Sequence, residues 1–254
     1  MNIQLLRHAT LAINLGGFNI LVDPMLSPSR TSDPIANTAN QQRNPLVDLP
    51  FNENYLVKVL QSIDAVIVTH LHNDHWDQQA RDLLPKSLPI FCQPDDQLRI
   101  EDAGFLAVQP VSKSVNWNGL QVVRTEGQHG RGKIGELMAP VSGFVLKAAG
   151  EPLMYIAGDT VWCDEVEQAL ELHQPEIIVV NAGAAQFTSG GPITMDADDV
   201  INVATAAPEA TVIAVHMEAI NHCLLSREEL RKATEAAAIA SRVNIPQDGE
   251  SVTI

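Results

Sequence analysis

Residues 65–77 read AVIVTHLHNDHWD, an apolar run that passes directly into three histidines and two aspartates. The chain has only 8 histidines, so such a cluster is poor material for a hydrophobic core. The pattern His-x-His-x-Asp-His suits a metal site, because imidazole and carboxylate together bind zinc, manganese or iron. His70 and His72 point the same way on an extended segment and can bind one ion, while Asp74 and His75 lie past the turn and face a second. The alternative without a metal is a solvated helix N-terminus with Asp74 as its cap.

Other ligand-type residues also follow apolar runs. ILV leads into Asp23, LMYIAG into Asp159 and TVIAV into His216, while LQVVRTEGQ precedes His129. In layered α/β folds, binding sites form beyond the carboxyl ends of strands, so we expect these groups to converge with His70 at one sheet edge. Taken singly, each has a plainer interpretation. Asp23 and Asp159 could be turn formers, His129 an exposed loop histidine, and His216 a strand-end histidine bonded to the backbone.

The pattern along the whole chain predicts a layered α/β protein with two sheets, in one domain spanning residues 1–254. Short β-rich runs come first, with Gly16 and Gly17 as the expected hairpin turn. A polar stretch from Ser27 to Glu53 is expected to be a long, functional surface loop. Helices are predicted at 54–62, 77–84, 95–103, 164–172, 196–207 and 227–240. Strands are predicted at 65–69, 89–93, 105–111, 120–125, 141–148, 153–157, 177–180, 211–215 and 251–254.

Composition narrows the class of partner. The formal net charge is −15 and Lys and Arg are nowhere clustered, so we expect no nucleic-acid partner, because such proteins need a basic stripe. Three cysteines without close spacing argue against a disulfide framework and favour a reducing cytoplasm. No apolar run approaches the length of a membrane span, and no secretory signal is expected. The prediction is a cytoplasmic protein that acts on a small molecule. The oligomeric state stays open, and a homo-oligomer is compatible with the sequence.

The order of these residues resembles the metallo-β-lactamase fold superfamily of two-metal hydrolases, from Asp23 through the motif at 70–75 to His129, Asp159 and His216. RHATLAINLGGFNILVDP and GGPITMDADDVINVATAAPEATVIAVH are similar to the branch that contains L-ascorbate-6-phosphate lactonase and N-acyl-phosphatidylethanolamine phospholipase D. The resemblance implies a four-layer αβ/βα sandwich, in which two mixed β-sheets lie face to face with helices outside.

The resemblance also implies a binuclear site for two divalent ions, zinc or manganese ahead of iron. His70, His72 and His129 would hold one ion, Asp74, His75 and His216 the other, and Asp159 would bridge both. Asp23 would support the site from behind, because a ligating imidazole usually donates its other N–H to a carboxylate or carbonyl.

The predicted function is that of a metal-dependent hydrolase. Two ions can hold a hydroxide between them that attacks a carbonyl carbon or a phosphorus, so the substrate is expected to be a lactone or other ester, or a phosphodiester. Asp74 is counted with the catalytic residues, and His8 and His222 are candidates for contacting the substrate or protonating the leaving group. Both could equally be structural. The alternatives are a di-iron redox protein served by an external flavin protein, and a non-catalytic binding protein stabilised by metal.

Overall fold

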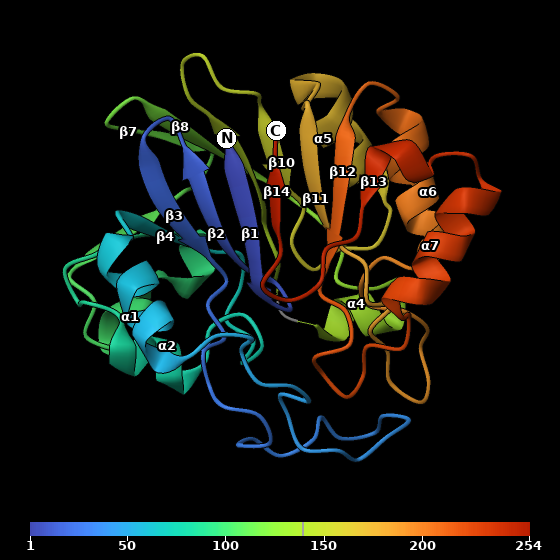
Figure 1. Ribbon diagram of the computed structural model, residues 1–254, viewed down its shortest axis with the longest axis horizontal. Helices are drawn as coiled ribbons and strands as arrows, with labels where there is room; N and C mark the ends of the chain where they lie inside the picture. Colours follow the sequence, from blue (N-terminus) through green and yellow to red (C-terminus); the bar gives the residue numbers. More distant parts are fainter. Residues whose placement is uncertain (139) are drawn as a thin grey trace.

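The computed structural model describes residues 1–138 and 140–254, and within them the strands form two seven-stranded sheets (Figure 1). The first contains, in spatial order, β14 (Ser251–Thr253), β1 (Asn2–Arg7), β2 (Thr10–Leu15), β3 (Phe18–Val22), β4 (Ala65–Val68), β5 (Pro89–Cys92) and β6 (Ala107–Pro110). The second contains β13 (Val243–Asn244), β12 (Thr211–Val215), β11 (Ile177–Asn181), β10 (Met154–Ile156), β9 (Gly143–Lys147), β8 (Leu120–Thr125) and β7 (Ser114–Trp117).

Both sheets are mixed and are built on the same plan. In the first, pairing is antiparallel from β14 to β3 and parallel from β3 to β6. In the second, it is antiparallel from β7 to β10 and parallel from β10 to β13. The last strand of the chain, β14, returns to pair with β1, which places the two termini side by side (Figure 1).

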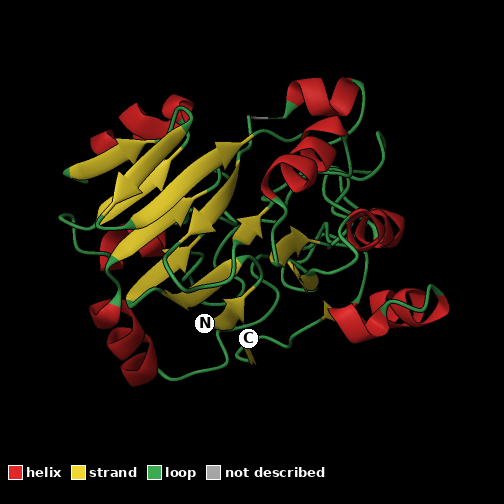
Figure 2. Ribbon diagram, turned by 90° about the horizontal axis from the view of Figure 1, so that it is seen from above, coloured by secondary structure: helices red, strands yellow, loops and turns green. Residues whose placement is uncertain are grey.

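Helices cover the outer faces of the sheets, as the view from above shows (Figure 2). On the first sheet lie α1 (Glu53–Ser62), α2 (Gln78–Leu83), the 3-10 turn η1 (Pro94–Asp96) and α3 (Gln97–Asp102). On the second lie α5 (Asp164–His173), α6 (Ala197–Ala206), α7 (Arg227–Ala236) and the 3-10 turn η2 (Ala240–Arg242), while α4 (Lys133–Leu137) lies near the lower edge of the sheets in Figure 1. The four-layer αβ/βα sandwich that the family resemblance implied is thereby confirmed.

Strand β4 shows why the fold has layers of core on both sides of each sheet. Ala65 and Ile67 belong to the apolar cluster between the two sheets, whereas Val66 and Val68 belong to the cluster beneath the helices of the first sheet. Successive side chains of a strand point to opposite faces. A strand that is buried on both faces therefore needs an apolar residue at every position, which accounts for the uninterrupted run AVIV.

The helices begin where their capping residues predict. Side chains cap the first turns of α1, α2, α6 and α7, namely Asn52, Asp77, Asp196 and Ser226. The cap of α2 decides between two interpretations of the histidine-rich motif, because Asp77 accepts the N–H of Ala80 at 2.7 Å. Asp74 is not the cap of this helix, so the alternative without a metal is wrong on that point.

Several boundaries differ from those predicted. Helix α7 ends at Ala236 and not at residue 240, because Ala238 adopts a left-handed conformation with φ 56° that no helix propensity signals. The short strands β7 and β13 and helix α4 were not predicted. His8 and Ala9 form the tight turn between β1 and β2, inside the β-rich run predicted at the start of the chain. The turn at Gly16 and Gly17 is confirmed, and both residues have positive φ as a two-residue hairpin requires.

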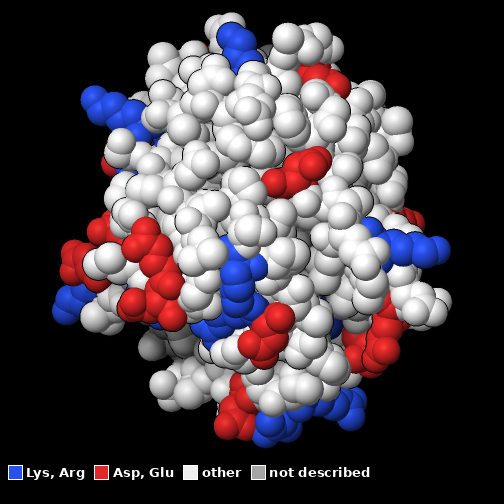
Figure 3. Space-filling model, turned by 90° about the vertical axis from the view of Figure 1, so that its left-hand side faces the viewer, with Lys and Arg blue, Asp and Glu red and all other residues white. Residues whose placement is uncertain are grey.

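Two surface features complete the description. In the described ranges no helix has the length and apolar character needed to cross a membrane. On the side of the molecule that Figure 3 presents, the basic side chains are dispersed among acidic and uncharged ones. This is the mixed charge pattern of a solvated surface.

Candidate metal centre

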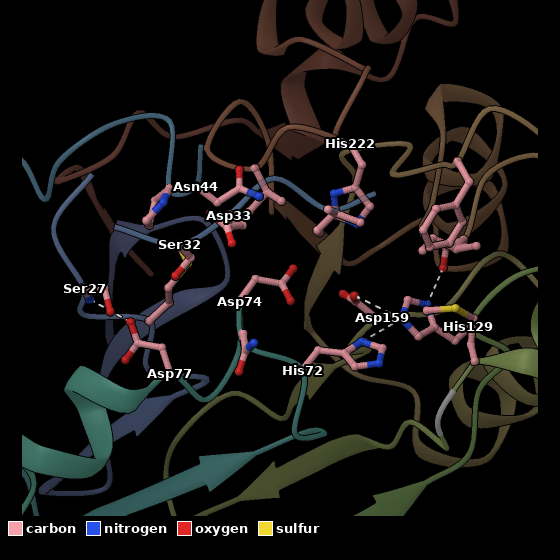
Figure 4. Close-up of a pocket in the computed structure, with 18 residues that line it drawn as sticks. Ser27, Ser32, Asp33, Asn44, His72, Asp74, Asp77, His129, Asp159 and His222 are labelled. Atoms are coloured by element: carbon pink, nitrogen blue, oxygen red, sulfur yellow. Dashed lines mark hydrogen bonds and ion pairs between the residues drawn. The ribbon is translucent and has the colours of Figure 1, made fainter. Parts of the chain in front are cut away.

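The ligand-type residues predicted at strand ends meet at one edge of the two sheets, and Figure 4 shows two of them, His129 and Asp159. Each follows a strand directly or after a short turn: His8 follows β1, Asp23 follows β3, His70 follows β4, His129 follows β8, Asp159 follows β10 and His216 follows β12. The sheets therefore position the site, because their strands deliver these residues to the same edge.

The first group consists of His70, His72 and His129. His72 Nδ1 lies 2.9 Å from His70 Nε2 and 3.3 Å from His129 Nε2. His129 Nδ1 lies 2.8 Å from the carbonyl oxygen of Ile193, which can only accept, so the proton is on Nδ1 and Nε2 presents a lone pair. His70 Nδ1 has a similar partner in Thr69 Oγ1 at 3.1 Å. Nitrogens whose lone pairs face one point are suited to hold a cation between them.

The second group consists of Asp74, His75, His216 and His8. Asp74 Oδ2 lies 3.5 Å from His216 Nε2 and 3.8 Å from His75 Nε2. Among the described residues, neither of these two buried nitrogens has a hydrogen-bond partner. Buried polar atoms are rarely left without a partner, so the pair is accounted for if a cation binds there.

Asp159 lies between the two groups. Its Oδ2 is 3.3 Å from His75 Nε2, 3.6 Å from His129 Nε2 and 3.8 Å from His70 Nε2, while its Oδ1 is 3.3 Å from His216 Nε2. Asn181 donates to Oδ1 at 2.7 Å and fixes the carboxylate. Asn181 was not among the predicted site residues, although it ends the apolar strand IIVVN just as the predicted residues follow theirs.

Asp23 supports both groups from behind. Its Oδ2 accepts from His75 Nδ1 at 2.8 Å and from Thr69 Oγ1 at 2.7 Å, and its Oδ1 accepts the N–H of Thr69 at 2.8 Å. Because the Thr69 hydroxyl donates to Asp23, it accepts from His70. One buried carboxylate thus orients His75 directly and His70 through Thr69, which leaves both Nε2 atoms free to bind.

Burial and charge set the protonation of the cluster. Burial lowers the pKa of His129 to about 4 and holds that of His70 well below its usual value, so both imidazoles are neutral, as metal binding requires. Burial also opposes the charge on His75, but the carboxylates of Asp159, Asp23 and Asp74 outweigh it and raise the pKa of His75 to about 10. A divalent cation would take the place of that proton.

The donor set fits divalent metal ions. Imidazole nitrogens and carboxylate oxygens converge, the lone pairs face inward, and the carboxylate of Asp159 can reach both groups. Such a mixed set suits zinc, manganese or iron.

His8 and His222, the two further candidates, occupy different places. His8 is fully buried behind Asp74 and donates from Nε2 to Asp74 Oδ2 at 3.2 Å. Its carbonyl oxygen accepts the N–H of His216 at 2.8 Å, so it holds two of the expected ligands. His222 lines the cavity in front of the cluster (Figure 4). Burial opposes the charge on His222, but the neighbouring Cys223 thiol and Asp74 raise its pKa above the usual value.

The cavity in front of the cluster has a volume of about 280 Å³. His72, Asp74, His129 and Asp159 reach it from the cluster. Part of its wall comes from the long loop between β3 and α1, which runs below the sheets in Figure 1 and which the sequence predicted as a functional loop. The apolar wall residues, which the sequence analysis did not identify, are Met25, Ile35, Met138, Phe187, Ile193 and Ile220. No sequence signal marks them, because they lie in irregular segments.

Comparison with known proteins places the chain in a family. The model of the β-lactamase superfamily domain matches residues 18–217. The UPF0173 protein YddR of Bacillus subtilis (strain 168) is 42% identical over 256 residues, which covers 100% of both chains. The isothiocyanate hydrolase from Delia radicum gut bacteria is 37% identical, with a TM-score of 0.93 over 100% of this chain and 99% of that one. A possible metal-dependent hydrolase from Veillonella parvula DSM 2008 is also 37% identical, with a TM-score of 0.95 over the same shares.

A chain-long match to YddR, a family model that covers most of the sequence and a cluster of histidines and aspartates at the expected sheet edge all agree. The chain belongs to the β-lactamase superfamily and, within it, to the UPF0173 family of metal-dependent hydrolases.

Proposed function

We propose that the protein hydrolyses small, neutral and largely apolar substrates at an electrophilic carbon, with isothiocyanates as the first class and lactones or other esters as the second. The observation that carries this proposal is the chemistry of the cavity. Its wall is mainly apolar, it opens onto the histidine and aspartate cluster, and among its described lining residues there is no Lys or Arg.

The absence of Lys and Arg among the described lining residues helps to decide whether the attacked substrate atom is carbon or phosphorus. Sites that take phosphates usually supply Arg or Lys to pair with the phosphate oxygens. Here the charged side chains of the wall are instead the carboxylates of Asp33 and Asp77, beside those of the cluster. An anionic phosphodiester would therefore find no basic partner on the described part of the wall, whereas a neutral substrate needs none. The solved isothiocyanate hydrolase, similar over the whole chain, supports the same choice.

Hydrolysis of an isothiocyanate needs no co-reactant other than water. Water adds across the C=N bond of R–N=C=S, so that hydroxyl goes to carbon and hydrogen to nitrogen, and the resulting thiocarbamic acid breaks its C–N bond to give an amine and carbonyl sulfide. When bound, two divalent ions supply a water of lowered pKa and polarise the substrate.

The chain's own residues would hold and orient the reacting groups. Asp23 and Asn181 fix the ligating side chains through their hydrogen bonds. The apolar wall receives the organic group and excludes competing water. His222, which lies on the cavity wall, is placed to deliver a proton to the substrate nitrogen or to the leaving oxygen of an ester.

A substrate panel tests the proposal. Zinc- or manganese-loaded protein is given benzyl isothiocyanate, a simple lactone and bis(4-nitrophenyl) phosphate, and the release of amine, acid and nitrophenolate is measured. Substrate is kept in large excess over protein, so that repeated turnover can be distinguished from the single reaction of an isothiocyanate with each cysteine thiol. We expect kcat/KM for the isothiocyanate to exceed that for the phosphodiester by at least about 100-fold, equivalent to roughly 2.7 kcal/mol. Faster turnover of the phosphodiester would overturn the proposal.

The variants His222→Ala and His8→Ala are both expected to lose activity, but for different reasons. Without His222 the proton donor is lost, so kcat falls by about 100-fold while metal content stays at the wild-type level. Without His8 the carboxylate of Asp74 loses its buried partner, so affinity for the second ion falls by about 10- to 100-fold. Activity assays combined with metal analysis separate the two. Unchanged turnover in both variants would remove these roles.

A further inference from the structure

We propose that residues 31–45 form a fixed cap over the metal centre that selects substrates by the size of their organic group, and that Asn221 is the residue that holds this cap in place. The selectivity part of this inference rests on the proposed function. The attachment of the cap does not depend on any substrate.

The cap is an ordered hairpin within the long loop. Ser32 and Asn44 exchange backbone hydrogen bonds of 2.8 and 2.9 Å, and Arg30 N donates to the carbonyl of Pro45 at 2.8 Å. The Arg43 guanidinium connects the two sides of the hairpin at its base, because it donates to the carbonyl oxygens of Arg30 and Thr31 at 2.9 and 3.0 Å. The hairpin thus has its own internal structure.

Asn221, which follows β12, fastens the hairpin to the other half of the molecule. Its Oδ1 accepts from Asn44 Nδ2 at 2.8 Å and from the N–H of Ile35 at 3.1 Å. Its Nδ2 donates to Thr38 Oγ1 at 2.7 Å and to the carbonyl of Asn40 at 2.8 Å. In return, Asn44 Oδ1 accepts the N–H of Asn221 at 2.9 Å, so the two amides pair reciprocally. Asn221 is fully buried, and its side-chain oxygen and nitrogen both form their hydrogen bonds with the cap.

Arg7 holds both ends of the loop that carries the cap. Its Nη2 donates to the carbonyl oxygens of Met25 and Ser27, at the start of the loop, at 2.8 and 2.9 Å. Its Nη1 donates to the carbonyl oxygen of Val47, near the end of the loop, at 3.0 Å. The Arg7 side chain is fully buried. A loop tied at its base and at its tip is a wall of constant shape and not a moving lid.

The cap contributes directly to the cavity. Ser32, Asp33, Ile35, Asn44 and Pro45 line it, and so do Ile220 and His222 on either side of Asn221 (Figure 4). If the amide pair were lost, the wall bearing Ile35 would move away from the wall bearing His222. The cavity would then admit larger groups and hold small ones less well.

The experiment compares Asn221→Ala with Asn116→Ala, a control on the exposed strand β7 whose side chain accepts only the N–H of Gly119. Trypsin reports on the attachment of the cap, because Arg30 directly precedes the cap, Arg43 lies within it, and both side chains are exposed. We expect nicking at these two sites to become at least about tenfold faster in Asn221→Ala and to stay unchanged in Asn116→Ala, since loss of anchoring exposes the backbone to local opening. Unchanged nicking in Asn221→Ala would overturn the role of Asn221.

Selectivity is measured on the metal-loaded proteins with alkyl isothiocyanates of increasing length and, in parallel, with 4-nitrophenyl esters of the same lengths. We expect Asn221→Ala to reduce the preference for short over long groups by about tenfold, mainly through KM, as for a change in a hydrophobic pocket. Ile35→Ala, which removes a wall side chain but no bond to Asn221, is expected to shift the preference to longer groups with no faster nicking. Faster nicking with unchanged length preference would overturn selection by the cap. Activity on esters alone would contradict the proposed isothiocyanate substrate, and the ester series would still test whether the cap selects substrates by length.

Discussion

Replacing Asp159 by asparagine is expected to lower kcat/KM by about three orders of magnitude, because the proposed metal centre would lose the carboxylate that we expect two ions to share. The asparagine amide has the same shape but carries no charge. Its N–H groups would also point at imidazole nitrogens that now lie 3.3 to 3.8 Å from the carboxylate. We therefore expect the purified variant to hold less than the wild-type complement of metal.

Metal analysis and steady-state kinetics on the same preparations check this prediction. Asp82→Asn is the matched control, because Asp82 lies on the exposed face of α2 and its side chain accepts only from Gln78. That variant should keep full activity. Wild-type metal content and wild-type activity in Asp159→Asn would show that the carboxylate is not a shared ligand.

The sequence predicted the cluster because its members occupy positions that a periodic pattern reveals. Asp23, His70, Asp159 and His216 each terminate an apolar run, and the sheets bring the ends of these runs together. The same logic gave the two sheets and the starts of the capped helices. It worked because local signals and the global fold agree at these positions.

The substrate cavity could not be predicted in the same way. Its walls depend on contacts between distant segments, such as that of Asn221 with Asn44, which lie 177 residues apart. Phe187 and Ile193 reach the cavity from an irregular stretch after β11 that has no periodicity to read. The turn at His8 was missed because RHAT continues the β-rich composition, while the left-handed backbone of His8, with φ 61°, is fixed by the pairing of β1 with β2.

Asp23→Asn is expected to leave the fold largely intact and yet to lower the affinity for metal by about 10- to 100-fold or more, because Asp23 determines which nitrogen of His75 carries the proton. The native carboxylate can only accept, so it holds one proton on His75 Nδ1 and leaves Nε2 as the nitrogen at which a metal ion would replace the second proton. An asparagine must still accept the N–H of Thr69, which turns its NH₂ group toward Thr69 Oγ1 and His75. His75 Nδ1 would then accept and the proton would move to Nε2, where the ion should bind. The fold is expected to survive because asparagine tolerates the left-handed backbone found here, with φ 43°.

Asp23→Ala provides the contrast that makes this prediction sharp. Alanine leaves the N–H and hydroxyl of Thr69 and the N–H of His75 buried without partners, at a cost of about 1–3 kcal/mol for each such group. We expect a clear fall in the free energy of unfolding for Asp23→Ala and a smaller one for Asp23→Asn, measured by urea denaturation of metal-free protein. Metal titration should show weakened binding in both variants. If Asp23→Asn bound metal as tightly as the wild type, Asp23 would be a packing and hydrogen-bonding residue of the sheet edge and would not set the tautomer of His75.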